Sequence, residues 1–176
     1  MVPTLGAPLS LPRDAWASHP HFPHQTLLLG SHEAFRTTSR TLVDRARRGG
    51  DTAALRWVFL RWKAAMGNHE HYEEGKLYPY LEARWGLDLD PARAGHTAVA
   101  EAEEAVLRAA TVDGPATEAL ARALADHDAV LLTHLDLEEA VVIPALLALS
   151  PAEFEAYTSS SLRRLLADLG EPTSGP

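Results

Sequence analysis

The sequence predicts an all-α protein: an up-down four-helix bundle with an extended N-terminal arm and a short C-terminal fifth helix. Three observations lead to this fold class. Four long segments place apolar side chains at steps of three and four residues, the period of a helix with one buried face. Prolines, glycines and capping residues separate these segments. No segment competes as a β-strand through alternating apolar and polar residues.

The elements follow one another in a simple order. Residues 1–24 contain five prolines and are expected to form the extended arm. The first bundle helix is predicted over about residues 24–48, because Gly49 and Gly50 then interrupt the helical pattern. Asp51 is a good N-cap for a second helix that reaches about residue 84.

Capping signals also mark the later helices. Asp90 followed by proline predicts the start of the third helix, which continues to about residue 110. A turn at residues 113–115 precedes the fourth helix, and Ser150 with Glu153 fits a capping box that opens the fifth. The predicted organisation is an arm over residues 1–24, a bundle over 25–149, a C-terminal helix over 150–170 and a tail over 171–176.

Composition limits the chemistry. A chain of 176 residues, 46% hydrophobic and 23% charged, has the composition of one soluble globular domain. It has no cysteine, which excludes disulfides, iron–sulfur clusters and thiol catalysis and leaves histidine and carboxylate as metal ligands. The net charge of −8 argues against binding to nucleic acid or anionic membranes. Because no apolar run reaches membrane length and no signal peptide is recognisable, the expected location is cytoplasmic.

The second and fourth predicted helices contain the same motif. His69-x-x-x-Glu73 and His134-x-x-x-Glu138 are each followed by a second glutamate and then by a proline. A histidine and a glutamate four residues apart lie about one turn apart on one helix face. Here that face is otherwise apolar, and a buried, unpaired carboxylate costs several kcal/mol. The two pairs therefore predict a metal-binding site. Because the motif occurs twice, two metal ions are favoured over one.

Each of the other two helices adds one histidine on its apolar face. A single such histidine is more often part of a core, but His32 on the first helix and His96 on the third make the pattern symmetric. The six candidate ligands are His32, His69, Glu73, His96, His134 and Glu138. Glu74 and Glu139 point about 100° away from their neighbours and are expected to support the ligands or face solvent.

Three further sets of residues are weaker candidates for a functional role. Glu103 lies two turns after His96 and is an alternative additional ligand. His127 lies about 10 Å along the helix from His134, which favours a role in the core or a channel. Three histidines on the N-terminal arm are similar to a short metal-binding tract, although a simple arm is the more economical interpretation; they are His19, His21 and His24.

With these motifs the chain resembles the hemerythrin-like family, also called HHE cation-binding domains, in its variant with four histidines and two glutamates. The resemblance covers about residues 24–149 and rests mainly on the paired His-x-x-x-Glu-Glu motifs. It implies a non-haem centre of two iron ions with the six candidate residues as ligands. It also implies that the two glutamates bridge the irons, together with an oxo, hydroxo or water bridge.

The chain departs from the oxygen-carrying members of that family. Ala100, four residues after His96, stands where they have a second histidine, and Glu138 stands where they have an aspartate. A missing imidazole predicts an open coordination position and a site more reactive than an oxygen carrier. No Glu-x-x-His motif of the ferritin-like bundles is present.

The predicted function is binding of, or reaction with, dioxygen, nitric oxide or peroxide. An apolar pocket beside the metals would be lined by Phe35, Trp62, Met66 and Leu131. No flavin, nicotinamide or P-loop motif is present, so turnover requires an external electron donor.

Zinc and manganese also suit these ligands. Two alternatives stay open: a sensor or carrier of oxygen, nitric oxide or iron without turnover, and a structural metal-binding bundle. The sequence leaves the catalytic residues and the oligomeric state open.

Overall fold

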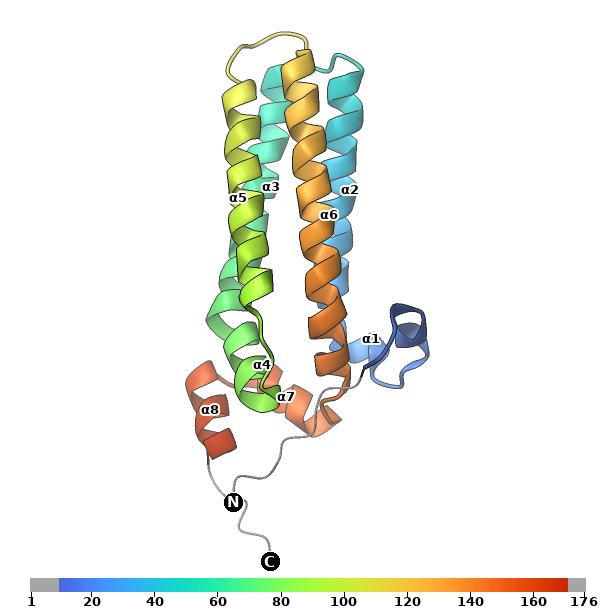
Figure 1. The fold of residues 1–176 in the computed structure, drawn as a ribbon, viewed down its shortest axis with the longest axis vertical. Helices are drawn as coiled ribbons and strands as arrows, with labels where there is room; N and C mark the ends of the chain where they lie inside the picture. The colour runs from blue at the N-terminus through green and yellow to red at the C-terminus, as the bar shows by residue number, and fades with distance from the viewer. Residues whose placement is uncertain (1–9, 171–176) are drawn as a thin grey trace, which may run out of the picture. The chain divides into compact units, whose positions relative to one another are not determined.

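The computed structural model describes residues 10–170 and consists of helices (Figure 1). The long helices are α2 (Leu28–Arg47), α3 (Thr52–Tyr72), α5 (Asp90–Ala109) and α6 (Glu118–Leu147). The short elements are the 3-10 helix η1 (Arg13–Ser18), α1 (Phe22–Gln25), the π-helix η2 (Glu73–Leu77), α4 (Tyr78–Trp85), α7 (Pro151–Ser159) and α8 (Leu162–Gly170). The predicted tail over residues 171–176 and the first nine residues of the predicted arm lie outside the described residues.

The described chain forms two compact units. One unit contains residues 28–71 and 90–138, and it is the four-helix bundle: α2, α3, α5 and most of α6, drawn side by side in Figure 1. The other unit contains the described residues up to 27, residues 72–89 and the chain from 139 onward. The expected all-α, up-down bundle is therefore confirmed.

The helix ends of the bundle unit follow the signals in the sequence. Gly49 adopts a positive φ of 72° at the end of α2, a conformation that glycine adopts without strain. Asp51 then caps α3, since its Oδ1 accepts a hydrogen bond from the Ala54 backbone N–H at 2.8 Å. The Thr52 N–H donates to the Gly114 carbonyl at 2.8 Å, which ties the α2–α3 loop to the α5–α6 loop.

The apolar stripes of the four long helices meet in one core. This core is interrupted by polar side chains at the positions that the sequence singled out, and all of them except the partly exposed His69 are buried. The core residues are Phe35, Leu42, Val43, Ala46, Leu55, Phe59, Trp62, Met66, Val99, Val106, Ala110, Leu120, Leu124, Leu131 and Leu135. The bundle therefore keeps a polar layer inside an otherwise apolar interior.

The second predicted helix is not one regular helix. The α-helix stops at Tyr72, a π-helical segment follows over Glu73–Leu77, and α4 resumes at Tyr78. Pro79 follows this segment closely; proline has no N–H to donate, and its ring crowds the carbonyl four residues earlier, which here belongs to Gly75 inside the segment. A π-turn is a common way to absorb such a conflict and is frequent at functional sites. Gly86, with φ 68°, ends α4 in a left-handed cap.

The ends of the chain also differ in detail from the predicted arm and single fifth helix. Residues 10–24 include the short helical elements η1 and α1, and Trp16 is buried with its Nε1 donating to the Leu11 carbonyl. The C-terminal helix is divided into α7 and α8, with Ser160 in an extended conformation between them. Serine favours such breaks because its hydroxyl competes for backbone hydrogen bonds.

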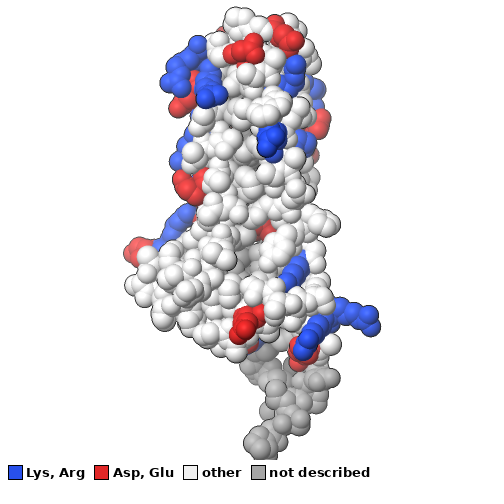
Figure 2. Space-filling view, turned by 180° about the vertical axis from the view of Figure 1, so that it is seen from behind, with Lys and Arg blue, Asp and Glu red and all other residues white. Residues whose placement is uncertain are grey.

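None of the helices within residues 10–170 combines the length and apolar character needed to cross a membrane. On the face drawn in Figure 2, basic and acidic side chains are interspersed, and neither sign forms a large continuous surface.

The start of α7 provides a test of the local structure. The Ser150 hydroxyl accepts from the Glu153 N–H while the Glu153 carboxylate accepts from the Ser150 N–H. Ser150→Ala is expected to lower the free energy of unfolding by about 1 kcal/mol, measured by urea denaturation. Ser31→Ala, the same change on the exposed side of α2, serves as the control and should not destabilise the protein. An equal loss for both variants would contradict the capping role.

Candidate metal centre

Four imidazoles, one from each long helix, form the central layer of the site. His32 on α2 lies opposite His69 on α3 with ring centroids 5.0 Å apart, and the two Nε2 atoms are 2.9 Å apart. His96 on α5 lies opposite His134 on α6 with centroids 4.6 Å apart. The structure therefore brings the four predicted histidines together as two facing pairs, as the two-fold pattern in the sequence indicated.

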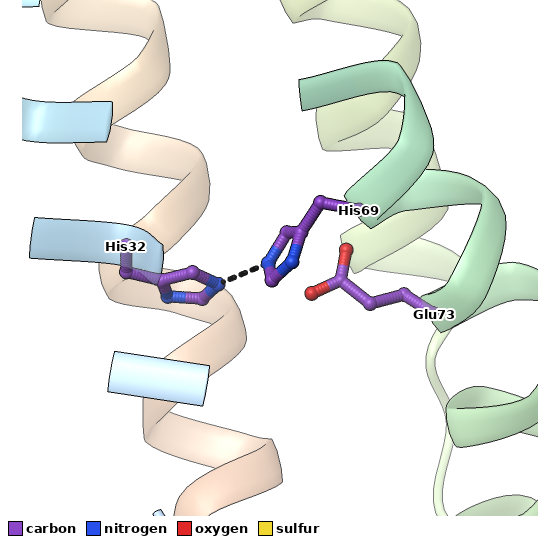
Figure 3. Close-up of side chains that lie close together, drawn as sticks. All are labelled: His32, His69 and Glu73. Carbon is purple, nitrogen blue, oxygen red and sulfur yellow. Dashed lines mark hydrogen bonds between the residues drawn. The ribbon is translucent and has the colours of Figure 1, made fainter. Parts of the chain in front are cut away.

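Glu73 adds a carboxylate beside the first imidazole pair (Figure 3). It is fully buried and begins the π-helical segment, one turn after His69 along the chain. His32, His69 and Glu73 each offer one ligand atom, and these atoms all lie within 4.8 Å of one another. Figure 3 shows the His32 ring approaching from α2, and the His69 ring and the Glu73 carboxylate from successive turns of α3 and the π-helical segment that continues it. Three such side chains are suited to hold a metal ion.

A second group of the same kind contains His96, His134 and Glu138, again with ligand atoms within 4.8 Å of one another. Glu138 is fully buried. Its Oε2 lies 3.8 Å from the Nε2 of His134, in its own group, and 3.6 Å from the Nε2 of His32, in the other. One carboxylate oxygen thus lies near an imidazole of each group.

The structure separates each of these glutamates from its neighbour in the sequence. Glu74 is exposed, whereas Glu73 is buried among the imidazoles. Glu139 is buried, and its Oε2 accepts a hydrogen bond from Arg13 Nη2 at 2.5 Å. Glu139 therefore has a cation as partner. The sequence did not indicate this role for Arg13, because the two residues are far apart in the chain.

An apolar layer lies one helical turn from the histidine layer. In each long helix the residue three positions from the histidine, toward the loops at residues 49–51 and 113–115, is apolar and buried. These residues are Phe35, Met66, Val99 and Leu131. The Phe35 ring lies 5.2 Å from the His69 ring and 5.9 Å from Trp62. The residues predicted to line an apolar pocket thus belong to the core on one side of the polar layer.

Ala100, the residue four positions after His96, lies on the exposed side of α5. A histidine at this position would therefore point toward solvent. The inward residue one turn after His96 is instead Val99, which is completely buried. The helix α5 therefore offers the site no second imidazole at either position, since residue 99 is valine and residue 100 is alanine.

Glu103, considered above as an additional metal ligand, is paired with a lysine. It is buried on α5, and its Oε2 accepts a hydrogen bond from the Lys63 ammonium of α3. Burial raises the pKa of the Glu103 carboxyl, and the adjacent Lys63 opposes that shift. Neither group of potential metal ligands within residues 10–170 includes Glu103. Glu103 and Lys63 form an ion pair, which gives the carboxylate its partner without a metal.

The N-terminal histidines likewise belong to neither group found in the described chain. The rings of His19 and His21 are 5.0 Å apart in an edge-to-face arrangement. His21 Nδ1 lies 3.2 Å from the Leu147 carbonyl oxygen. His24 is exposed on α1. These contacts hold His21 to the end of α6, which is a structural role.

His127 lies in the bundle core among aromatic rings. It is 1% exposed, and its ring meets those of Trp62 at 4.8 Å and Phe59 at 5.3 Å, both edge-to-face. No hydrogen-bond partner for either ring nitrogen is found among residues 10–170. Burial, with a smaller effect from the Lys63 charge, lowers the pKa of His127 to about 4. His127 is therefore a neutral core side chain at physiological pH, in line with the expected core role.

A cation site held by histidine and carboxylate inside a four-helix bundle defines the class of this protein. The comparison with protein families identifies the particular family: residues 24–146 match the hemerythrin HHE cation-binding domain. This match spans well over half of the chain, and the protein belongs to that family. Neither the curated proteins nor the solved structures that were compared gave a match.

The low pKa of His127 predicts a specific pH dependence. Between pH 6.5 and about 4 the unfolded chain binds a proton at this residue and the folded protein does not. Compared with His127→Leu, the wild-type protein should therefore lose up to about 3 kcal/mol of stability as pH falls through this window. Above pH 6.5 the difference should be constant.

Urea denaturation of both proteins at a series of pH values measures this difference directly. The comparison cancels the titration of all groups that the two proteins share. A difference in stability that does not change between pH 6.5 and 4 would show that His127 titrates normally in the folded protein.

Proposed function

We propose that this protein is a non-haem di-iron protein that binds or reacts with a small ligand, namely dioxygen, nitric oxide or peroxide. The six residues that would hold the metals are His32, His69, Glu73, His96, His134 and Glu138. When bound, iron would supply Lewis-acid and redox chemistry to a ligand at the centre of the bundle. The family supports cation binding, and the choice of iron, of two ions and of ligand is our inference.

One observation carries the proposal: the Oε2 atom of Glu138 lies close to an imidazole of each group, 3.6 Å from His32 and 3.8 Å from His134. A carboxylate shared in this way supports two metal positions near each other, both of which Glu138 would help to hold. Two independent mononuclear sites would not need this placement. Both triads share the same ligand types, so they suit the same kind of ion.

The donor set fits iron. It contains imidazole nitrogens and carboxylate oxygens and no sulfur, because the chain has no cysteine. Such ligands suit non-haem iron, zinc and manganese, whereas calcium and magnesium prefer oxygen ligands alone. Two carboxylates offset part of the charge of two dications, which makes their burial less costly. Redox reactions with dioxygen, nitric oxide or peroxide favour iron over zinc within this set.

The neighbouring residues of the chain would select the ligand. Phe35, Met66, Val99 and Leu131 surround the histidine layer on one side with apolar surface, which keeps bulk water away. A low-dielectric environment strengthens electrostatic interactions at the centre. Since these side chains are closely packed, the space beside the site suits a diatomic molecule or peroxide better than a large substrate. Turnover would draw electrons from an external donor.

Anaerobic reconstitution with ferrous iron is the direct experiment. The protein is loaded, its iron content is measured, and dioxygen, nitric oxide and peroxide are added separately while visible absorption is recorded. Two irons per chain and iron-dependent consumption of one ligand support a redox enzyme. A reversible spectral change without consumption supports a sensor or carrier. Failure to bind iron, with zinc bound instead, would overturn the di-iron proposal and leave a structural metal-binding bundle.

Substitution of Glu138 tests the bridging position. Because its carboxylate lies between the two groups, Glu138→Ala is expected to lower the occupancy of both metal positions, well below two ions per chain. Metal content after dialysis against limiting free iron provides the measurement. Glu74→Ala removes an exposed glutamate next to a candidate ligand and should leave the content unchanged. Full stoichiometry in Glu138→Ala would contradict the assignment.

A further inference from the structure

Gly95 is an unfavourable residue for the interior of its helix. It lies inside α5, a segment rich in alanine, and directly precedes His96. Glycine in a helix interior is less favourable than alanine because it loses more backbone freedom on folding. Gly95 has ordinary helical geometry, since it is not among the glycines with a positive φ in the described chain. Backbone conformation therefore does not explain the glycine.

The contact with His134 does explain it. A Cβ added to Gly95 would lie 2.3 Å from Nδ1, 3.0 Å from Cγ and 3.3 Å from Cε1 of the His134 ring. Contacts below 3.0 Å are essentially never made by real Cβ atoms, so the ring or the helix would have to move. His134 is buried, with the His96 ring on one side, and its Nε2 lies 3.8 Å from Glu138. A displaced imidazole would therefore change its position relative to His96 and Glu138, the other members of its group.

The other imidazole pair has no such dependence. Gly30 lies two residues before His32 on α2, and Gly67 lies two residues before His69 on α3. A Cβ at either position would meet nothing within 4 Å. Among the glycines inside the long helices of the described chain, Gly95 is thus the one whose missing side chain makes room for a candidate ligand. The two halves of the site depend on different features of the bundle.

We propose that Gly95 is a positioning residue for His134, and that its missing side chain sets the metal affinity of the group formed by His96, His134 and Glu138. This inference rests on the proposed metal-binding function. The backbone of α5 acts as the support against which the imidazole lies, with Nδ1 toward Gly95. The group formed by His32, His69 and Glu73 keeps its affinity when residue 95 changes.

Gly95→Ala tests this proposal. We expect the affinity of one of the two metal positions to fall by about 10–100-fold, the range found when the support of a metal ligand is lost. Titration with ferrous iron under anaerobic conditions, followed by metal analysis, should give about one tight ion per chain. Gly30→Ala and Gly67→Ala are matched controls that also add one methyl group inside a helix near a ligand. Both should keep the wild-type stoichiometry and be at least as stable as the wild type.

A double-mutant cycle with His134 separates positioning from a general effect on α5. In the metal-free protein, Gly95→Ala should lower the midpoint of thermal unfolding when His134 is present. In a His134→Ala background the same change should raise it, because the clash is gone and alanine favours the helix. This measurement needs no metal, so it remains decisive even if the wild-type protein fails to bind iron and the proposed function is wrong.

Two results would overturn the role of Gly95. One is wild-type affinity at both metal positions in Gly95→Ala. The other is an equal change in unfolding midpoint with and without the His134 ring, which would mean that the added methyl group acts on something other than His134.

Discussion

The cost of placing ionisable side chains inside a helical bundle governs this structure. Glu73 and Glu138 are fully buried, and of the histidines beside them His32, His96 and His134 are buried while His69 is partly exposed. A buried carboxylate loses its hydration, and a protein tolerates that loss only when charge or hydrogen bonding compensates for it. The convergence of two carboxylates and four imidazoles at one level of the bundle makes cations the natural compensation. The apolar residues one turn away raise the cost of leaving these carboxylates without a compensating charge.

Two other buried carboxylates are compensated by basic side chains instead. Glu103 is paired with Lys63, and Glu139 with Arg13, so each of these carboxylates has a cationic side chain at hand. The central glutamates instead lie beside imidazoles, which act as metal ligands when neutral. The contrast between these two environments is the physical reason for proposing Glu73 and Glu138, and not Glu103 and Glu139, as metal ligands.

The two halves of the centre share their residue types but not their supports. Glu73 begins a π-helical segment, whereas Glu138 lies within the continuous α-helix α6 although Pro144 follows it at the same spacing. The ring of His134 lies against the backbone of α5 at Gly95, and His69 has no equivalent contact with a glycine. A site that is symmetric in sequence is therefore asymmetric in structure. Two metal positions with different affinities are the expected consequence.

The sequence by itself determined the all-α class, the four long helices and the face that each one buries, because helical periodicity and capping are local properties. It also identified the six residues that converge, since a His-x-x-x-Glu pair on an apolar stripe must point inward. Only the tertiary structure decided which neighbours meet across helices. The pairing of Glu139 with Arg13, the outward direction of Ala100 and the contact of Gly95 with His134 all depend on helix rotation and packing. A difference of one residue turns a side chain by about 100°, so these features cannot be read from spacing alone.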